Sequence, residues 1–366
     1  MNIEYQIGVF PVYPDGWRSE GSYKDHKLYV NGDLSANLGQ HDLMMGFALS
    51  HTWVADAWQN SNVNPATSAN IGSMQHFTYE DGLKWPSTQW KRTITSLTLQ
   101  DAYRLNDQVT ITGGLRMDHY NDFGSSFTPR LAAVWRINDK HVLKAQYAQS
   151  FRPPTFYELS WAKSLQPQRN HTAELSYIYK GTQNELRSTL FMSRLKNTIH
   201  EDSLLGYVSS NEADLRGIEL EGVHRYSSRL KIEGNASYVY TDDKEHGVRF
   251  FGAAETMANL AVTYEPTENI SVSSWVRHVG TRYREHNDSR APLAGYDTVA
   301  LTGRVRQLMD IKGLTLRVGI DNLFNELVRY PANLAYDAVT TSYFPSYQGD
   351  HIRPGRTAWV GLSKSF

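Results

Sequence analysis

Residues 313–323 read GLTLRVGIDNL and are the clearest case of the alternation that dominates this sequence. Apolar side chains alternate with other side chains from position 314 to position 321. Successive side chains of a β-strand point to opposite faces of its sheet, so a period of two separates the two sets. One face holds Leu314, Leu316, Val318 and Ile320, and the other holds Thr315, Arg317, Gly319 and Asp321. The stretch therefore predicts a strand with one apolar and one polar face.

The same alternation recurs along most of the chain, for example in residues 109–118 and 230–240. We predict tight connections at residues 38–40, 106–107, 138–140, 182–184, 227–228, 266–268 and 311–312. We predict longer connections at residues 54–90, 121–126, 152–170, 197–215, 242–255, 281–295 and 324–354. A regular succession of short and long connections is typical of outer-membrane barrels, which have short periplasmic turns and long extracellular loops.

These segments amount to about sixteen strands, the first of them within residues 3–9. The predicted fold class is therefore all-β, and the predicted architecture is a transmembrane antiparallel up-and-down β-barrel. A soluble all-β sugar-binding protein would not need an apolar face on nearly every strand. A β-propeller would repeat every four strands, and we find no such period.

The composition of the 366 residues agrees with this interpretation. The mean hydropathy is -0.51, and no window holds the roughly 18 consecutive apolar residues that a spanning helix needs. The chain has 22 Tyr, 9 Trp and no Cys, which suits the aromatic girdles of an exported barrel. With a formal net charge of -1 and no long basic run, the sequence predicts no nucleic-acid partner.

Five stretches carry a family resemblance through their order and spacing. They are LQDAYRLNDQVTITGGLRMDHY at 99–120, FTPRLAAVWRINDKHVLKAQYAQSFRPPTFYEL at 127–159, LRGIELEG at 215–222, DNLFN at 321–325 and RPGRTAWVGLSKSF at 353–366. Together they resemble the TonB-dependent outer-membrane receptors, and the resemblance covers most of residues 91–366. The motif residues are Phe151, Arg152, Pro153, Pro154, Asn322, Leu323 and Phe324.

The resemblance implies location in the bacterial outer membrane and a receptor for active transport. Such receptors are not enzymes. They bind a scarce nutrient, here most simply a ferric siderophore or similar metal chelate, and the inner-membrane partner TonB energises uptake through a plug domain. The implied partners are a small-molecule ligand, TonB, outer-membrane lipid and the outer-membrane assembly machinery. The terminal aromatic residue Phe366 resembles the signal that this machinery reads.

The chain departs from a complete receptor of this family. Its first ten residues do not resemble a signal peptide, and we find no plug domain. We therefore expect residues 1–366 to be part of a receptor barrel, with about sixteen of an expected twenty-two strands. The alternative is a plugless, porin-like diffusion channel of sixteen strands, which the chain length would suit.

Candidate ligand contacts follow from position, because aromatic and basic residues above the long-loop ends of the strands would face the extracellular vestibule. They are Tyr120, Arg152, Tyr157, Trp161, Arg282, Tyr283, Arg329 and Tyr330. Packing in the aromatic girdle or the loops is the alternative role for each of them. Likewise, Pro153 and Pro154 would end a strand and stiffen a loop, because proline donates no ladder hydrogen bond.

The sequence predicts no catalytic, metal or cofactor site. The 13 histidines are scattered without the paired spacing of metal ligands. Pairs of potential catalytic residues, such as Ser50 and His51, are neighbours on a strand, so their side chains would point to opposite faces. A haem receptor of the family would carry an Asn-Pro-Asn-Leu motif where this chain reads Ser164-Leu165-Gln166-Pro167.

Overall fold

The computed structural model describes residues 16–202, 206–337, 342–347 and 349–365. The predicted strand within residues 3–9 and the terminal Phe366 lie outside the described residues. The large sheet is formed by β1 (Ser19–Leu38), β2 (His41–Val63), β3 (Asn70–Phe77), β4 (Lys91–Arg104), β5 (Val109–Tyr120), β6 (Gly124–Arg136), β7 (His141–Arg152), β8 (Gln168–Lys180), β9 (Asn184–Asp202), β10 (Gly206–Arg225), β11 (Leu230–Asp243), β12 (Thr256–Tyr264), β13 (Ile270–Val279), β14 (Tyr296–Arg306), β15 (Leu314–Asp321) and β20 (Thr357–Lys364).

The loops add smaller elements. Two short ribbons join β16 (Arg329–Tyr330) to β19 (His351–Ile352) and β17 (Leu334–Asp337) to β18 (Ser342–Pro345). The helices are α1 (Phe156–Trp161) and the single turns η1 (Tyr79–Asp81) and η2 (Leu308–Asp310). In the part of the chain that the structure describes, none of these helices has the length and apolar character needed to cross a membrane.

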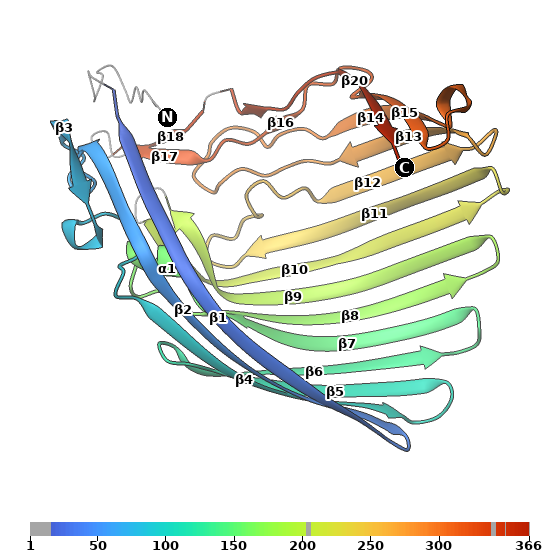
Figure 1. The fold of residues 1–366 in the computed structure, drawn as a ribbon, viewed down its shortest axis with the longest axis horizontal. Helices are drawn as coiled ribbons and strands as arrows, with labels where there is room; N and C mark the ends of the chain where they lie inside the picture. The colour runs from blue at the N-terminus through green and yellow to red at the C-terminus, as the bar shows by residue number, and fades with distance from the viewer. Residues whose placement is uncertain (1–15, 203–205, 338–341, 348, 366) are drawn as a thin grey trace.

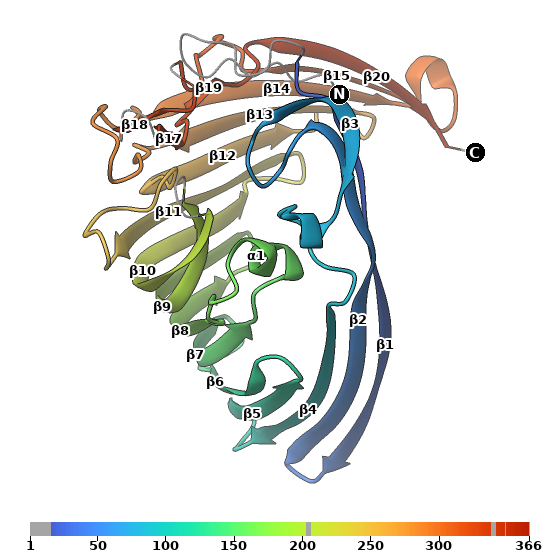
Figure 2. The same ribbon diagram turned by 90° about the vertical axis from the view of Figure 1, so that its left-hand side faces the viewer.

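Every strand of the large sheet pairs antiparallel with its neighbour, in the order β1-β2-β4 and then in sequence from β5 to β15 and β20. The prediction of an all-β, antiparallel up-and-down arrangement is confirmed. Among the described residues the sheet does not close, because β1 and β20 form its two edges. It curves instead into an open trough (Figures 1 and 2).

Six of the seven tight turns lie where the sequence predicts them, whereas the one predicted at 311–312 is a longer connection, residues 307–313, that contains η2. Two predicted long connections are wrong, because β5 and β6 are joined by residues 121–123 alone, and β9 and β10 extend to Asp202 and from Gly206. The connection at 54–90 is also shorter than predicted, since β2 continues to Val63 and its Ser61 still pairs with Ser19 of β1. Backbone pairing needs no apolar face, so the strands continue beyond the point where the apolar alternation ends.

The register separates the two faces of the sheet. Ile218 of β10 lies opposite Leu190 of β9 and Tyr238 of β11, so these three side chains share one face. The other face carries polar side chains such as Glu219 and Ser237, which are also opposite each other. The long hydrophobic runs of period two therefore align into one continuous apolar surface.

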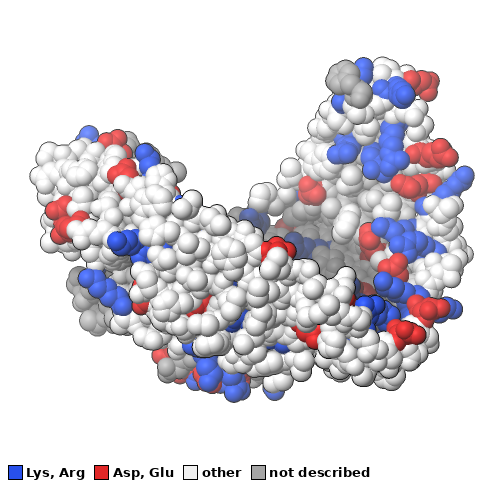
Figure 3. All heavy atoms as spheres, turned by 60° about the horizontal axis from the view of Figure 1, so that its bottom comes forward, with Lys and Arg blue, Asp and Glu red and all other residues white. Residues whose placement is uncertain are grey.

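The polar face lines the hollow of the trough. Helix α1 lies within this hollow (Figure 2), and it contacts Arg92 of β4 and Arg152 of β7. Leu97 and Leu143, which are odd-numbered residues of the same strands, therefore point to the convex side. On the face shown in Figure 3, uncharged side chains cover a broad continuous area, and charged side chains gather along its margins, most densely on the right.

The apolar convex face is exposed. Its large side chains include Leu28, Leu34, Met45, Leu97, Leu115, Leu131, Leu175, Leu190, Met192, Leu220, Leu260 and Val318. A monomeric soluble protein rarely exposes an apolar surface of this extent. The outward-facing apolar band of a membrane barrel accounts for it, since hydrocarbon then covers these side chains.

Gly217 is required by the close approach of β9, β10 and β11. A Cβ atom at this position would lie 2.3 Å from the carbonyl oxygen of Tyr238 and 2.7 Å from Cζ of Phe191. We therefore expect Gly217→Ala to lower the free energy of unfolding by about 1–3 kcal/mol, because the backbone of β11 must shift. Urea unfolding in lipid, followed by tryptophan fluorescence, measures this change.

Gly222→Ala on the same strand is the matched control. Its Cβ would meet only the carbonyl oxygen of Glu185 at 3.8 Å, which is an ordinary contact. Equal losses for the two variants would contradict the steric explanation.

Candidate functional site

The first predicted group lies at the loop end of β7, where the chain enters the hollow. Arg152 donates hydrogen bonds from its two Nη atoms to the carboxylate of Glu158, at 3.0 and 2.9 Å. Thr155 caps α1, and its side chain accepts a hydrogen bond from the backbone N–H of Glu158 at 3.1 Å. Pro154 is fully buried just before this cap. The proline motif therefore fixes where the strand ends and α1 begins.

Charge and burial oppose each other at Glu158. Burial alone would raise the pKa of the Glu158 carboxyl, but the hydrogen bonds from Arg152 and Thr155 outweigh it and lower this pKa below its ordinary value. Glu158 is therefore ionised at neutral pH and holds the guanidinium of Arg152. Arg152 therefore helps to hold the loop after β7, and its charge is balanced by the carboxylate of Glu158.

Helix α1 presents two exposed aromatic rings. Tyr157 and Trp161 lie with their ring centroids 6.4 Å apart. Tyr207 of β10 completes the group, at 6.1 Å from Tyr157 and 6.4 Å from Trp161. All three pairs are close to edge-to-face, the arrangement in which the edge of one ring meets the face of another.

The second group lies where β13 and β14 meet the last long loop. Arg282 is only 3% exposed, and its guanidinium lies 4.8 Å over the ring of Tyr296 and 5.8 Å from that of Tyr330. It also donates hydrogen bonds to the carbonyl oxygens of Ala294, at 2.7 Å, and of Arg329. Arg282 therefore stands behind the site and holds the loops together.

A pocket of about 510 Å³ opens in front of this group. It is lined by Trp275 and Arg277 of β13, Tyr296 of β14, Tyr330 and Arg353. Arg353 lies 4.9 Å over the ring of Tyr330, and both Arg277 and Arg353 are exposed. Arg277 is an odd-numbered residue of β13 and so belongs to the polar face that lines the hollow.

The pocket is electropositive. Neither Arg277 nor Arg353 forms an ion pair within the described ranges of the chain. The one carboxylate that lines the pocket, Asp321, accepts a hydrogen bond from the indole of Trp359 at 3.1 Å. The hydrogen bond from Tyr296 lowers the pKa of the Tyr330 hydroxyl against the opposing effect of burial, and the positive charges of Arg353 and Arg277 lower it further. The positive charges around this pocket favour the binding of an anionic group.

A buried ion cluster holds the last loop against the loop between β13 and β14. The Asp350 carboxylate accepts two hydrogen bonds from Arg284, at 2.8 and 2.9 Å, and one from Arg290 at 3.3 Å. It also accepts the backbone N–H of Ala332 at 3.1 Å. The guanidinium of Arg284 holds the pKa of the Asp350 carboxyl far below its ordinary value, although burial opposes this shift.

The Asn-Leu-Phe motif forms the turn after β15. Asn322 has a left-handed backbone, with φ of 51°. Its side-chain amide donates to the carbonyl oxygen of Glu326 and its Oδ1 accepts the backbone N–H of the same residue, both at 2.8 Å. The backbone N–H of Leu323 donates to Val299 of β14, whereas the ring of Phe324 is exposed. The motif therefore closes the strand end beside the pocket.

The remaining predicted residues lie apart from one another along the loop end of the sheet. Tyr120 is buried at the end of β5, with its ring 5.3 Å from that of Phe151. Tyr283 lies near Arg249 in the upper loops, where burial and the carboxylate of Glu255 raise the pKa of its hydroxyl. Arg329 is exposed on β16. Their predicted ligand contacts remain predictions.

The structure brings together histidines that are scattered in the sequence. His246 and His286, from two different loops, stack with their ring centroids 4.0 Å apart. His246 also lies 2.7 Å from the carboxylate of Asp243, beside a cavity of about 300 Å³ that His200 helps to line. Among the residues that the structure describes, no group of three or more potential ligands is placed to hold a metal ion.

Sequence reasoning missed Tyr207, Arg277, Tyr296 and Arg353. Arg277 lies inside β13, where the alternation gives no sign of its distance from the loop end, whereas Tyr296 begins β14 directly after the predicted connection at 281–295. Arg353 lies immediately before the closing strand, at the start of a stretch already singled out for its family resemblance. A search for basic and aromatic residues on the polar face near each long loop would have found Arg277 and Tyr296.

Comparison with known proteins identifies the family. Residues 4–323 match the family model described as TonB dependent receptor-like, beta-barrel. The chain is 22% identical to the iron-regulated outer membrane virulence protein of Vibrio cholerae serotype O1, over 91% of this chain and 50% of that protein. It is also 22% identical to the ferric enterobactin receptor PirA of Pseudomonas aeruginosa, over 100% of this chain and 52% of that protein.

Solved structures agree on the fold. A crystal structure of the ferric enterobactin receptor PfeA from Pseudomonas aeruginosa matches with a TM-score of 0.73 and 19% identity, over 93% of this chain and 54% of that chain. This chain thus spans about half the length of the relatives that it matches, and those relatives are receptors or outer-membrane proteins. The chain belongs to the TonB-dependent receptor β-barrel family and lies in the bacterial outer membrane.

Proposed function

We propose that this chain forms the barrel wall of an active-transport receptor that binds an anionic metal chelate, such as a ferric siderophore, for TonB-energised uptake. The observation that carries the proposal is the pocket with two exposed guanidinium groups, Arg277 and Arg353, beside the ring of Tyr330. Guanidinium groups bind carboxylate and phenolate oxygens through charge-assisted hydrogen bonds. Relatives named for ferric enterobactin and for iron regulation support this class of ligand.

The exposed rings on α1 would add a second contact. Tyr157 and Trp161 offer exposed aromatic surface to a ligand that enters from the loop end. The loop end would then be the extracellular side, and the tight turns the periplasmic side, as in other outer-membrane barrels. TonB, a plug domain and the assembly machinery are proposed partners on the same family grounds, with Phe366 as the proposed assembly signal.

Tryptophan fluorescence of the full chain tests the ligand, because Trp275 lines the pocket. We expect saturable quenching by at least one anionic ferric chelate from a panel of ferric catecholates, ferric hydroxamates, cobalamin and oligosaccharides. The double variant R277Q/R353Q should weaken this binding by about 100-fold, since two charge-assisted hydrogen-bonding groups are lost.

Arg317→Gln is the matched control. Arg317 faces the same hollow from β15, at a distance of five strand positions from Asn322 and outside the pocket lining. We expect its affinity for the chelate to equal that of the unmodified chain. Ion conductance without saturable binding of any chelate would instead support the plugless, porin-like channel.

A further inference from the structure

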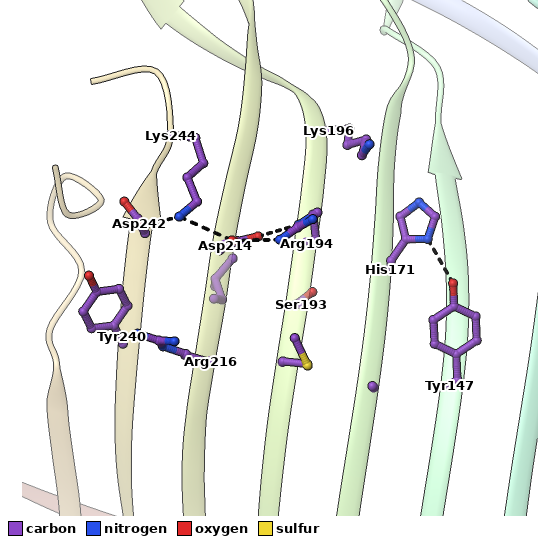
Figure 4. Close-up of a pocket in the computed structure, with 13 residues that line it drawn as sticks. Tyr147, His171, Ser193, Arg194, Lys196, Asp214, Arg216, Tyr240, Asp242 and Lys244 are labelled. Carbon is purple, nitrogen blue, oxygen red and sulfur yellow. Dashed lines mark hydrogen bonds and ion pairs between the residues drawn. The ribbon is translucent and has the colours of Figure 1, made fainter. Parts of the chain in front are cut away.

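A charged patch lies on the convex face at the loop ends of β7 to β11 (Figure 4). It borders a cavity of about 590 Å³. The patch consists of Arg194, Lys196, Glu212, Asp214, Arg216, Asp242 and Lys244, together with the ring of Tyr240. All of these residues have even numbers, and all lie on β9, β10 or β11 except Lys244, which directly follows β11. The exposed apolar residues Leu190, Met192 and Leu220 also have even numbers and share this face. The patch therefore points away from the hollow.

The register fixes the depth of the patch. Asp214 of β10 lies opposite Arg194 and Asp242, and one step nearer the tight turns Arg216 lies opposite Met192 and Tyr240. One further step brings Ile218 between Leu190 and Tyr238. Charged side chains thus give way to apolar ones within two rows, so the patch lies at the upper boundary of the apolar band.

Arg216 differs from the other cations of the patch. Arg194 pairs with Asp214 at 2.8 Å, Lys196 with Glu212 at 2.9 Å, and Lys244 bridges Asp214 and Asp242. Arg216 forms no ion pair with a described residue, and its guanidinium lies 4.7 Å over the ring of Tyr240. The ring holds the guanidinium in place and leaves its N–H groups available to an anion.

The position and the charge of the patch indicate which kind of ligand it would bind. A side chain on the convex face at this depth meets the headgroup region of the outer leaflet, where the anionic groups are lipid phosphates. Four cations face three carboxylates in the patch, and the excess of positive charge is at Arg216. The exposed side chain of Leu190 and the partly buried side chain of Ile218, directly below, would contact the acyl chains of the same lipid.

We propose that this patch is a binding site for a phosphorylated lipid of the outer leaflet, with Arg216 bound to the phosphate. Arg216 is the arginine of the LRGIELEG stretch, for which the ligand pocket offers no role. Gly217 beside it admits the close approach of the neighbouring strands, so the stretch combines a packing residue with a lipid contact. The proposal requires the outward orientation of the patch and rests on the extracellular position of the loop end given with the proposed function, but it is independent of the transported ligand.

Native mass spectrometry of the full chain, purified in detergent and titrated with lipid A, tests the proposal. We expect retention of bisphosphorylated lipid A and at least tenfold weaker retention of the dephosphorylated form. Arg216→Gln should weaken binding of bisphosphorylated lipid A by about tenfold, and Arg216→Lys, which keeps the positive charge, should weaken it less. Sodium phosphate at millimolar concentration should not displace the lipid.

Arg187→Gln is the control, because Arg187 lies on β9 and faces the hollow beside Glu221. Its binding of lipid A should be unchanged. The proposal is overturned if Arg216→Gln binds lipid A as well as the unmodified chain does, or if Arg187→Gln loses as much affinity. Displacement by free phosphate alone would also overturn it, since the site would then bind phosphate without the lipid. A variant whose migration in gel electrophoresis no longer changes on heating is misfolded. If Arg216→Gln misfolds, the comparison between Arg216→Lys and the unmodified chain tests the proposal.

Discussion

Leu190→Arg is expected to lower the free energy of unfolding of the chain in lipid by about 2 kcal/mol, because Leu190 lies within the apolar band but near its upper boundary. Leu190 is 51% exposed on the convex face and lies between Leu175 of β8 and Ile218 of β10. A guanidinium at this position would have to leave water for hydrocarbon, with no carboxylate beside it on this face. Equilibrium unfolding in phospholipid vesicles, followed by tryptophan fluorescence, measures the loss.

Thr189→Arg is the neighbouring control, because Thr189 points into the hollow. It forfeits the hydrogen bond between the hydroxyl groups of Thr189 and Ser176, which are 2.9 Å apart, and should cost about 1 kcal/mol. The assignment of the two faces would be wrong if Thr189→Arg proved the more damaging substitution.

Asp350→Asn is expected to release the last loop from the loop between β13 and β14. The substitution removes one of the two carboxylates that Arg284 and Arg290 share and leaves them Asp288 alone. The side chains of Arg284 and Asp350 are 7% and 6% exposed. Breaking a buried ion pair from one side costs about 3 kcal/mol, which corresponds to roughly 100-fold faster opening of the loops. Hydrogen exchange of residues 281–295 and 331–337 measures this opening.

The same carboxylate makes loop opening dependent on pH. The pKa of Asp350 is lowered in the folded chain, so its ion pairs contribute fully above the ordinary carboxyl pKa of about 4, and this contribution decreases as pH falls from there toward the lowered pKa. We expect faster opening at pH 3 than at pH 6 in the unmodified chain and a smaller difference in Asp350→Asn. Asp139→Asn, in the exposed turn between β6 and β7, should match the unmodified chain at both values.

Several parts of this fold are encoded locally. The period of two in GLTLRVGIDNL already separates an apolar face from a polar one, because neighbouring side chains of a strand point in opposite directions whatever the strand pairs with. Tight turns are equally local, and six of the seven lie as predicted, the exception being the longer connection at 307–313. The two wrong connections, at 121–126 and 197–215, contain polar sequence that nevertheless pairs, since the hydrogen bonds of a ladder come from the backbone of the partner strand.

The sequence also predicted part of the candidate site. Tyr157, Trp161 and Tyr330 were expected at the loop end and lie there, although no observation yet tests whether they bind a ligand. Arg282 was expected to face the vestibule and is buried behind the pocket instead. Its position depends on carbonyl groups of two loops that are distant in the sequence, so no local pattern could have predicted its burial.

The sequence by itself therefore determined the strands, their two faces, the tight turns and the family motifs, because each depends on residues within a few positions of one another. Only the tertiary structure placed Arg277 beside Arg353, Tyr207 beside α1, and Asp350 against Arg284. It also placed Arg216 on the convex face at the edge of the apolar band. These neighbours are set by strand register and loop packing, which are properties of the whole sheet and not of any one segment.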